Sequence, residues 1–196
     1  MSTLLLRFAA PLQAWGTESK YDIRKTDREP SKSGIVGFLA AALGRKRDES
    51  VEDLNALRVG VRADQEGEII QDFHMVHKDE KTSYLTRRYY LSDAVFVVGV
   101  ESEDDAVLQK LVDAVKNPVF PLFLGRCSCP PCGPIVLGIR EFDLETALDK
   151  EPWQIPEWRR KRETSVPCLR KVIESDSGGV VRKDRAISFS PYHREY

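Results

Sequence analysis

Three of the four cysteines lie within six positions, at Cys127, Cys129 and Cys132. Thiolates gathered in this way can bind zinc, with Cys168 or a histidine as a fourth ligand. The spacing matches neither of the usual paired C-x2-C knuckles, and free cysteines are commonly buried as small hydrophobic residues. We therefore predict structural thiols and no bound metal or other cofactor, and a zinc site is the alternative.

Two histidines, His74 and His77, stand three positions apart within residues 68–90. On a strand this spacing points the two side chains to opposite faces, so we do not expect them to share a metal ion. One of them could act as a general base toward an RNA 2′-hydroxyl, with Tyr84 and Lys81 as further candidates. The alternative is an exposed or hydrogen-bonded histidine, and we predict no catalytic residue.

The segment PSKSG, residues 30–34, precedes an apolar stretch that is typical of a helix. A helix N-terminus presents free N–H groups and the positive end of the helix dipole, and Lys32 and Ser33 would add a charge and a hydroxyl. Ser33 is also a good N-cap. The segment therefore predicts either an anion site or an ordinary capped helix.

Aromatic and basic residues are mixed in several parts of the chain. Single-stranded RNA is held by stacking on flat side chains and by positive charge along its backbone. Most of these aromatic residues are expected to pack in the core or on a hairpin, with two or three free to contact nucleic acid. The set consists of Trp15, Tyr21, Tyr84, Arg87, Arg88, Tyr89, Tyr90 and Arg126.

Hydrophobic periodicity indicates the elements that would position these residues. It predicts strands at 3–8, 58–64, 93–100 and 134–142, helices at 33–44 and 102–117, and a hairpin over 68–90 with a charged tip. The order is that of the ferredoxin-like split βαβ fold with a hairpin between its second and third strands. We predict an α+β, RRM-like domain over residues 1–142 and a small β-rich C-terminal subdomain over 143–196.

Composition limits the function classes. The chain has 196 residues, 41% of them hydrophobic, and a formal net charge of −1. A polyanion site must therefore be a local basic patch rather than a property of the whole surface. The short apolar start lacks the basic region of a signal peptide, and no apolar run is long enough to span a bilayer. We predict a cytoplasmic protein with reduced thiols and no membrane contact.

Four motifs in order carry a family resemblance: LLLRFAAPLQAWG, PSKSGIVGFLAAALG, TRRYYLSDAVFVV and PVFPLFLGRCSCPP. Over roughly residues 3–140 the chain resembles the CasD family of CRISPR-associated proteins, within the RAMP superfamily. The resemblance implies a non-catalytic subunit of a type I-E Cascade complex in antiviral defence. Such subunits cap the 5′ handle of the guide RNA, contact the backbone subunit CasC and the large subunit CasA, and meet target DNA through the complex.

The resemblance also implies a thumb hairpin at about 72–90 and a set of RNA-binding residues. The set is Gln13, Trp15, Arg24, Lys32, Ser33, His74, Arg87, Arg88, Gly125, Arg126 and Ser128. Two other functions are kept as alternatives. One is a metal-independent endoribonuclease that processes CRISPR repeat RNA, as in type I-C systems, and the other is a zinc-stabilised interaction module.

Overall fold

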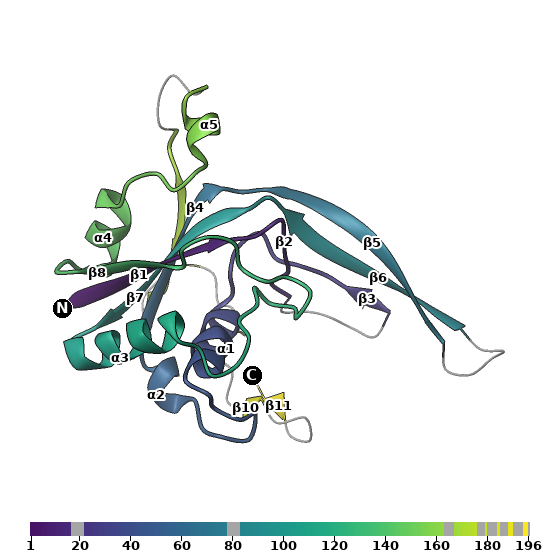
Figure 1. Cartoon of the computed structure of the whole chain (residues 1–196), viewed down its shortest axis with the longest axis horizontal. Helices are drawn as coiled ribbons and strands as arrows, with labels where there is room; N and C mark the ends of the chain where they lie inside the picture. Colours follow the sequence, from purple (N-terminus) through teal and green to yellow (C-terminus); the bar gives the residue numbers. More distant parts are fainter. Residues whose placement is uncertain are drawn as a thin grey trace.

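The computed structural model describes residues 1–16, 22–77, 83–162, 167–175, 179, 184, 188–189 and 194–195. Its centre is an antiparallel five-stranded sheet with the strand order β8-β1-β7-β4-β9 (Figure 1). The strands are β1 (Ser2–Ala9), β4 (Arg58–Gln65), β7 (Val95–Ser102), β8 (Val136–Arg140) and β9 (Arg170–Ile173).

Helices cover both faces of this sheet because its central strands are apolar on both faces. In β1, Leu4 and Leu6 point into the larger core, while Leu5 points into the smaller core on the opposite face. Helices α1 (Lys32–Ala42) and α3 (Asp105–Lys116) pack against the larger core, and α4 (Leu144–Lys150) packs against the smaller one. The short helix α2 (Glu52–Asn55) adds Leu54 to the larger core, whereas the short helix α5 (Glu157–Arg160) has no buried residue.

The predicted order of strand, helix, strand, hairpin, strand, helix and strand is confirmed. The predicted N-cap of the first helix is wrong by two residues. Ser31, not Ser33, is the N-cap, because its side chain accepts the hydrogen bond from the Gly34 N–H. Ser33 lies inside the first turn, and its hydroxyl donates to Asp184 instead of capping the helix.

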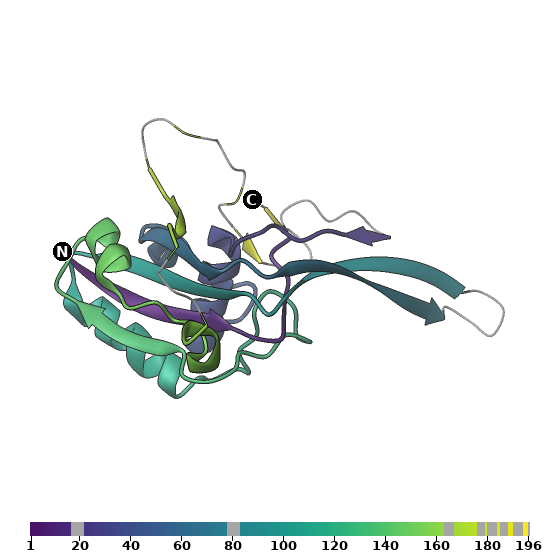
Figure 2. The same ribbon diagram turned by 90° about the horizontal axis from the view of Figure 1, so that it is seen from above.

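The hairpin consists of β5 (Glu68–His77) and β6 (Ser83–Ser92), and it projects away from the central sheet (Figures 1 and 2). Its predicted charged tip lies outside the described residues. Two short strands that the sequence did not predict, β2 (Leu12–Gln13) and β3 (Ile23–Arg24), pair with β6. The N-terminal polar stretch therefore widens the hairpin into a second sheet.

The C-terminal part of the chain packs on the central sheet instead of standing apart from it. Strand β9 pairs with β4 at the sheet edge, and α4 buries Leu144 and Leu148 against the sheet. Residues on both sides of the predicted boundary at residue 143 thus contribute to one sheet, and the division into two domains stays a prediction. Strands β10 (Ser188–Phe189) and β11 (Arg194–Glu195) form a separate two-stranded ribbon.

Candidate nucleic-acid interface

The projecting hairpin has two faces with different chemistry. Residues paired across an antiparallel ladder share a face, and successive residues alternate between faces. Phe73 pairs with Arg87 and Met75 pairs with Leu85, whereas Asp72 pairs with Arg88 and His74 pairs with Thr86. We call the first the apolar face (Ile23, Ile69, Phe73, Met75, Leu85 and Arg87) and the second the basic face (Arg24, Asp72, His74 and Arg88).

Arg24 and Arg88 are brought together on the basic face by the parallel pairing of β3 with β6, in which they are register partners. Arg126 fixes this arrangement from the cysteine-rich loop. Its guanidinium donates hydrogen bonds to the carbonyl oxygens of Tyr89 (3.1 Å) and Arg24 (3.0 Å). It also lies 4.6 Å from the centre of the Tyr90 ring, within cation–π range.

The positive charge of this cluster is not neutralised within the described part of the chain. Among those residues, no carboxylate forms an ion pair with Arg24, Lys25, Arg88 or Arg126. The buried Nε of Arg88 has no hydrogen-bond partner there either. Guanidinium groups with spare donors are suited to phosphate oxygens, which accept two parallel hydrogen bonds. The cluster therefore has the charge and donors of a phosphate site.

Arg87 is exposed but lies on the other face, so the adjacent arginines Arg87 and Arg88 do not act on the same surface. This separation follows from the period of two along a strand. Arg87 is surrounded by exposed apolar side chains, among them Phe73 and Met75, which are 56% and 62% exposed. The predicted arginine pair is thus divided between a basic and an apolar surface.

Gln13 and Trp15 are buried, at 0% and 1% exposure. Gln13 donates to the carbonyl of Ala94 (2.7 Å) and accepts from the Trp15 indole N–H (3.1 Å). The Trp15 ring stacks on Phe8, with ring centres 5.8 Å apart. These side chains hold residues 13–15 on the core, and they offer no surface for direct contact with RNA.

Gly125 supports the same residues from the other side. Its φ is +87°, and a Cβ at this position would lie 1.6 Å from the carbonyl oxygen of Ala14. The close approach expected at this glycine is therefore to the protein's own backbone, since Ala14 N–H also donates to Leu124 O. Ser128 is exposed on the next turn, and its hydroxyl lies 3.8 Å from the Cys129 sulfur.

The cysteines of this loop have different environments. Cys129 is buried, and burial raises the pKa of its thiol. Cys127, Cys132 and Cys168 are exposed. Within the described ranges, no three histidine, cysteine, aspartate or glutamate side chains lie together as a metal-ion ligand set. The zinc alternative therefore gains no ligand set from this part of the chain.

The predicted anion site at the first helix is filled by the chain's own carboxylates. Asp184 accepts hydrogen bonds from the backbone N–H groups of Lys32 (2.6 Å) and Ser33 (3.2 Å), and also from the Ser33 hydroxyl. The Lys32 ammonium pairs with Glu174 at 2.5 Å. Lys32 and Ser33 thus hold Glu174 and Asp184 on α1, and their donors are occupied by these carboxylates. No local pattern around Ser33 indicates Asp184, because the two residues are 151 positions apart in the chain.

His74 belongs to the basic face, where its Nε2 lies 2.6 Å from an oxygen of Asp72. His77 points to the opposite face, as the strand period predicts. Tyr84 is exposed on the side of His74, two residues before Thr86. Lys81 and Tyr21 lie outside the described residues. The Asp72–His74 pair is a feature that the sequence analysis missed, although the two-residue spacing on a strand predicts a shared face.

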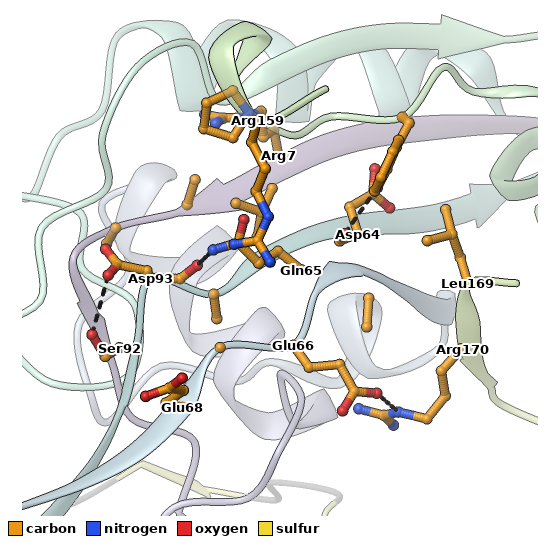
Figure 3. A pocket seen from close by; sticks show the side chains of 18 of the residues that line it. Arg7, Asp64, Gln65, Glu66, Glu68, Ser92, Asp93, Arg159, Leu169 and Arg170 are labelled. Atoms are coloured by element: carbon orange, nitrogen blue, oxygen red, sulfur yellow. Dashed lines mark hydrogen bonds and ion pairs between the residues drawn. The ribbon is translucent and has the colours of Figure 1, made fainter. Parts of the chain in front are cut away.

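A cavity of about 1020 Å³ lies at the base of the hairpin (Figure 3). Its wall includes Glu66, Gly67 and Glu68 from the β4–β5 junction, and Arg170 donates to Glu66 at 2.7 Å. The amide of Gln65 donates to the Asp93 carbonyl, as Figure 3 shows. Acidic and basic side chains are mixed in this wall, so the cavity has no excess of positive charge, unlike the cluster of Arg24, Arg88 and Arg126.

Comparison with known proteins identifies the family. The family described as CRISPR-associated protein (Cas_Cas5) matches residues 3–196.

The chain belongs to the Cas5 family of CRISPR-associated proteins.

Relatives agree with this assignment. The Cas5 chain is 35% identical over 161 residues to the CRISPR system Cascade subunit CasD of Escherichia coli K12, and the match covers 70% of each chain. A crystal structure of a Cas protein is 43% identical, with a TM-score of 0.77 and coverage of 98% of this chain and 90% of the other. A chain of a CRISPR RNA-guided surveillance complex is 28% identical, with a TM-score of 0.74 and coverage of 99% and 86%.

The resemblance to CasD noted from the sequence is thereby confirmed, and the matched structures share the mixed α/β architecture of this Cas5 chain. Within the described part of the Cas5 chain, each helix is too short or too polar to cross a bilayer.

Proposed function

We propose that the chain is a non-catalytic CRISPR RNA-binding subunit of a type I-E Cascade antiviral surveillance complex. It caps the 5′ handle of the guide RNA and joins the large subunit CasA to the backbone subunit CasC. It acts in the cytoplasm and meets target DNA only through the assembled complex. Membership of the Cas5 family and similarity to a Cascade subunit support this proposal.

One observation carries the proposal: Arg24 and Arg88 on the basic face, with Arg126 bonded beside them, form no ion pair in the described chain, although the net charge is −1. Arginines without carboxylate partners repel one another, so their clustering favours a polyanion as the missing partner. RNA phosphates supply that charge at regular spacing, and each contact releases bound counterions.

The architecture is consistent with this role. We infer a ferredoxin-like domain in strands β8, β1, β7 and β4, and its support is their order in the sheet together with α1 and α3 on one face. We assign the β5–β6 hairpin as the thumb, inserted between the second and third strands of that domain. In this proposal the cavity at the base of the hairpin and the basic face lie on either side of the path of the RNA. The roles of single residues are argued from their contacts, because similarity of fold does not assign them.

Contacts within the chain divide the predicted site residues into two groups. We propose that Arg24, Arg88 and His74 on the basic face contact RNA directly, together with the exposed Ser128, and that the exposed Arg87 contacts it from β6 on the apolar face. Arg126 shares that charge but acts mainly by fixing β3 to β6. The other predicted residues, namely Gln13, Trp15, Lys32, Ser33 and Gly125, support the loops that present this surface.

The test is a binding measurement with labelled 5′-handle RNA at several salt concentrations. We expect Arg88→Ala to weaken binding by about 1–2 kcal/mol and to reduce the slope of log affinity against log salt by about one. Lys110→Ala, on the exposed side of α3, is the matched control and should bind as the wild type does. Equal affinities of Arg88→Ala and Lys110→Ala would contradict the proposed interface.

A second candidate function is supported by the Asp72–His74 contact of 2.6 Å. A histidine held by a carboxylate can remove a proton from an RNA 2′-hydroxyl, and the adjacent Arg88 could stabilise the developing charge. This would make the chain a metal-independent endoribonuclease. Repeat RNA incubated with the chain in EDTA distinguishes the two functions: RNA that remains intact supports the cap, and cleavage that is lost in His74→Ala supports the nuclease.

A further inference from the structure

The outer edge of β5 offers unpaired backbone groups along the hairpin. Arg87 donates its N–H to Asp22 O at 2.7 Å, on the side of β6 away from β5. In an antiparallel ladder, the backbone N–H and C=O groups of two paired residues either point toward each other or both point away from the partner strand. Phe73, the partner of Arg87, therefore turns its N–H and C=O outward, as do Ile69, Gln71 and Met75 at the same period.

A second hydrogen bond supports this register. The Tyr89 carbonyl accepts a hydrogen bond from Arg126, so this carbonyl also points away from β5. The backbone N–H and C=O of Gln71, the register partner of Tyr89, must therefore point outward as well. Among the described residues, the outward N–H and C=O groups of Ile69, Gln71, Phe73 and Met75 have no hydrogen-bond partner. β5 thus presents a free edge to solvent on the side opposite β3 (Figures 1 and 2).

The same residues carry the exposed apolar side chains. Ile69, Phe73 and Met75 are exposed, and Leu85 and Ile23 continue the apolar face across β6 and β3. A ten-residue edge strand with apolar side chains would promote aggregation if it stayed uncovered. Its pattern therefore indicates that another chain covers it in the functional assembly.

The charge on β5 distinguishes a protein from RNA as the occupant. Residues 68–77 contain Glu68 and Asp72 but no lysine or arginine. The arginines that attract phosphates, Arg24, Arg87 and Arg88, lie on β3 and β6, so the positive charge of the described hairpin is concentrated away from the outer edge of β5. A ladder of alternating donors and acceptors is matched by an extended polypeptide, which supplies both groups at the same spacing.

We propose that β5 binds an extended strand of a neighbouring protein subunit by edge-to-edge pairing, so that the hairpin carries RNA on the β6–β3 side and protein on the β5 side. This inference rests on the proposed function, since it needs an assembly with a neighbour. The strand pairs with Ile69, Gln71, Phe73 and Met75 and places apolar side chains on the apolar face. The cavity begins at Gly67 and Glu68, so a chain leaving the edge at its base reaches that space.

The test uses Gln71→Pro with Gln71→Ala as its matched control. Proline removes the outward N–H without breaking the β5–β6 ladder, whereas alanine keeps the N–H and shortens the same side chain. Binding to the CasC-type backbone subunit and to the CasA-type large subunit is measured separately, with guide RNA present and absent. We expect Gln71→Pro to lower affinity for one of them about tenfold and Gln71→Ala to change it less than about twofold.

A second pair of variants tests the apolar face without touching the backbone. Met75→Ser should weaken the same interaction, while Val76→Ser, on the opposite face, should not. Hydrogen exchange of the amides of residues 69, 71, 73 and 75 should slow when the subunit binds and stay unchanged with 5′-handle RNA alone. All variants should bind that RNA as the wild type does, which shows that the hairpin is folded.

Three results would overturn the inference. They are wild-type assembly by both Gln71→Pro and Met75→Ser, protection of these amides by RNA alone, and protection that depends only on the concentration of the chain itself, which indicates a second copy. Loss of handle binding by the wild-type chain would instead refute the proposed function. Failure of the strand contact with RNA binding intact would refute the edge pairing only.

Discussion

Replacing Asp184 tests how the C-terminal segment is held on α1. The carboxylate is only 7% exposed and accepts from two backbone N–H groups and one hydroxyl at the first turn of the helix. Asp184→Ala leaves those two N–H donors without their acceptor, and a buried donor left unsatisfied costs about 1–3 kcal/mol. The negative charge at the positive end of the helix dipole is lost as well.

We therefore expect Asp184→Ala to lower the free energy of unfolding by about 2–4 kcal/mol. Asp184→Asn keeps an acceptor oxygen but loses the charge, and we expect about 1 kcal/mol. The assay is chemical denaturation followed by tryptophan fluorescence. Asp104→Ala is the matched control, because Asp104 caps α3 through one exposed hydrogen bond to the Ala106 N–H, and its loss should cost about 1 kcal/mol.

Two outcomes would refute this reasoning. If Asp184→Ala is no more destabilising than Asp104→Ala, the contacts at α1 do not hold the C-terminal segment. If Asp184→Ala increases affinity for 5′-handle RNA, the carboxylate occupies a site that RNA can use, and Lys32 and Ser33 return to the interface. We expect the RNA affinity to stay unchanged, because Asp184 bonds to Lys32 and Ser33 and to no residue of the basic face.

Gly125→Ala should destabilise the chain by about 2–4 kcal/mol in the same denaturation assay, because the added Cβ meets the Ala14 carbonyl at a positive φ; an unchanged midpoint would show that the loop can move aside. Burial raises the pKa of the Cys129 thiol, so a thiol reagent should label the three exposed cysteines in the native protein and Cys129 only after unfolding, as peptide mass spectrometry can show. The hydrogen bond from Arg45 lowers the pKa of Asp53 below its ordinary 3.8, so the stabilisation is present above that pH and is lost as the pH falls through the lower folded value. The stability difference between wild type and Asp53→Asn should therefore shrink on acidification below pH 3.8, and a constant difference would contradict the pairing.

Local patterns in the sequence were sufficient for the order of the main elements. The apolar start predicts β1, the β-branched run predicts β7, and the spacing of Leu108, Leu111 and Val115 predicts α3. Each signal lies within one element, where hydrophobic period and helix caps act over a few residues. The two-residue period along β5 likewise places His74 and His77 on opposite faces.

Tertiary structure alone decided which charged residues remain available to bind an anion from outside the chain. Lys32 and Ser33 have the sequence of an anion site, yet Asp184 and Glu174 occupy their donors from more than 140 residues away. Gln13 and Trp15 belong to a loop motif, but their side chains complete the core. Contacts of this kind depend on how distant segments pack, and no local pattern contains that information.

The division of the hairpin into a basic and an apolar face depends both on the local sequence pattern and on the tertiary structure. The sequence determines that Arg87 and Arg88 point to opposite sides once they lie on a strand. Only the pairing of β3 with β6 brings Arg24 beside Arg88 and leaves the far edge of β5 open. Strand partners are chosen by backbone hydrogen bonds and by the packing of whole segments, and the side chains near each bond do not specify the partner.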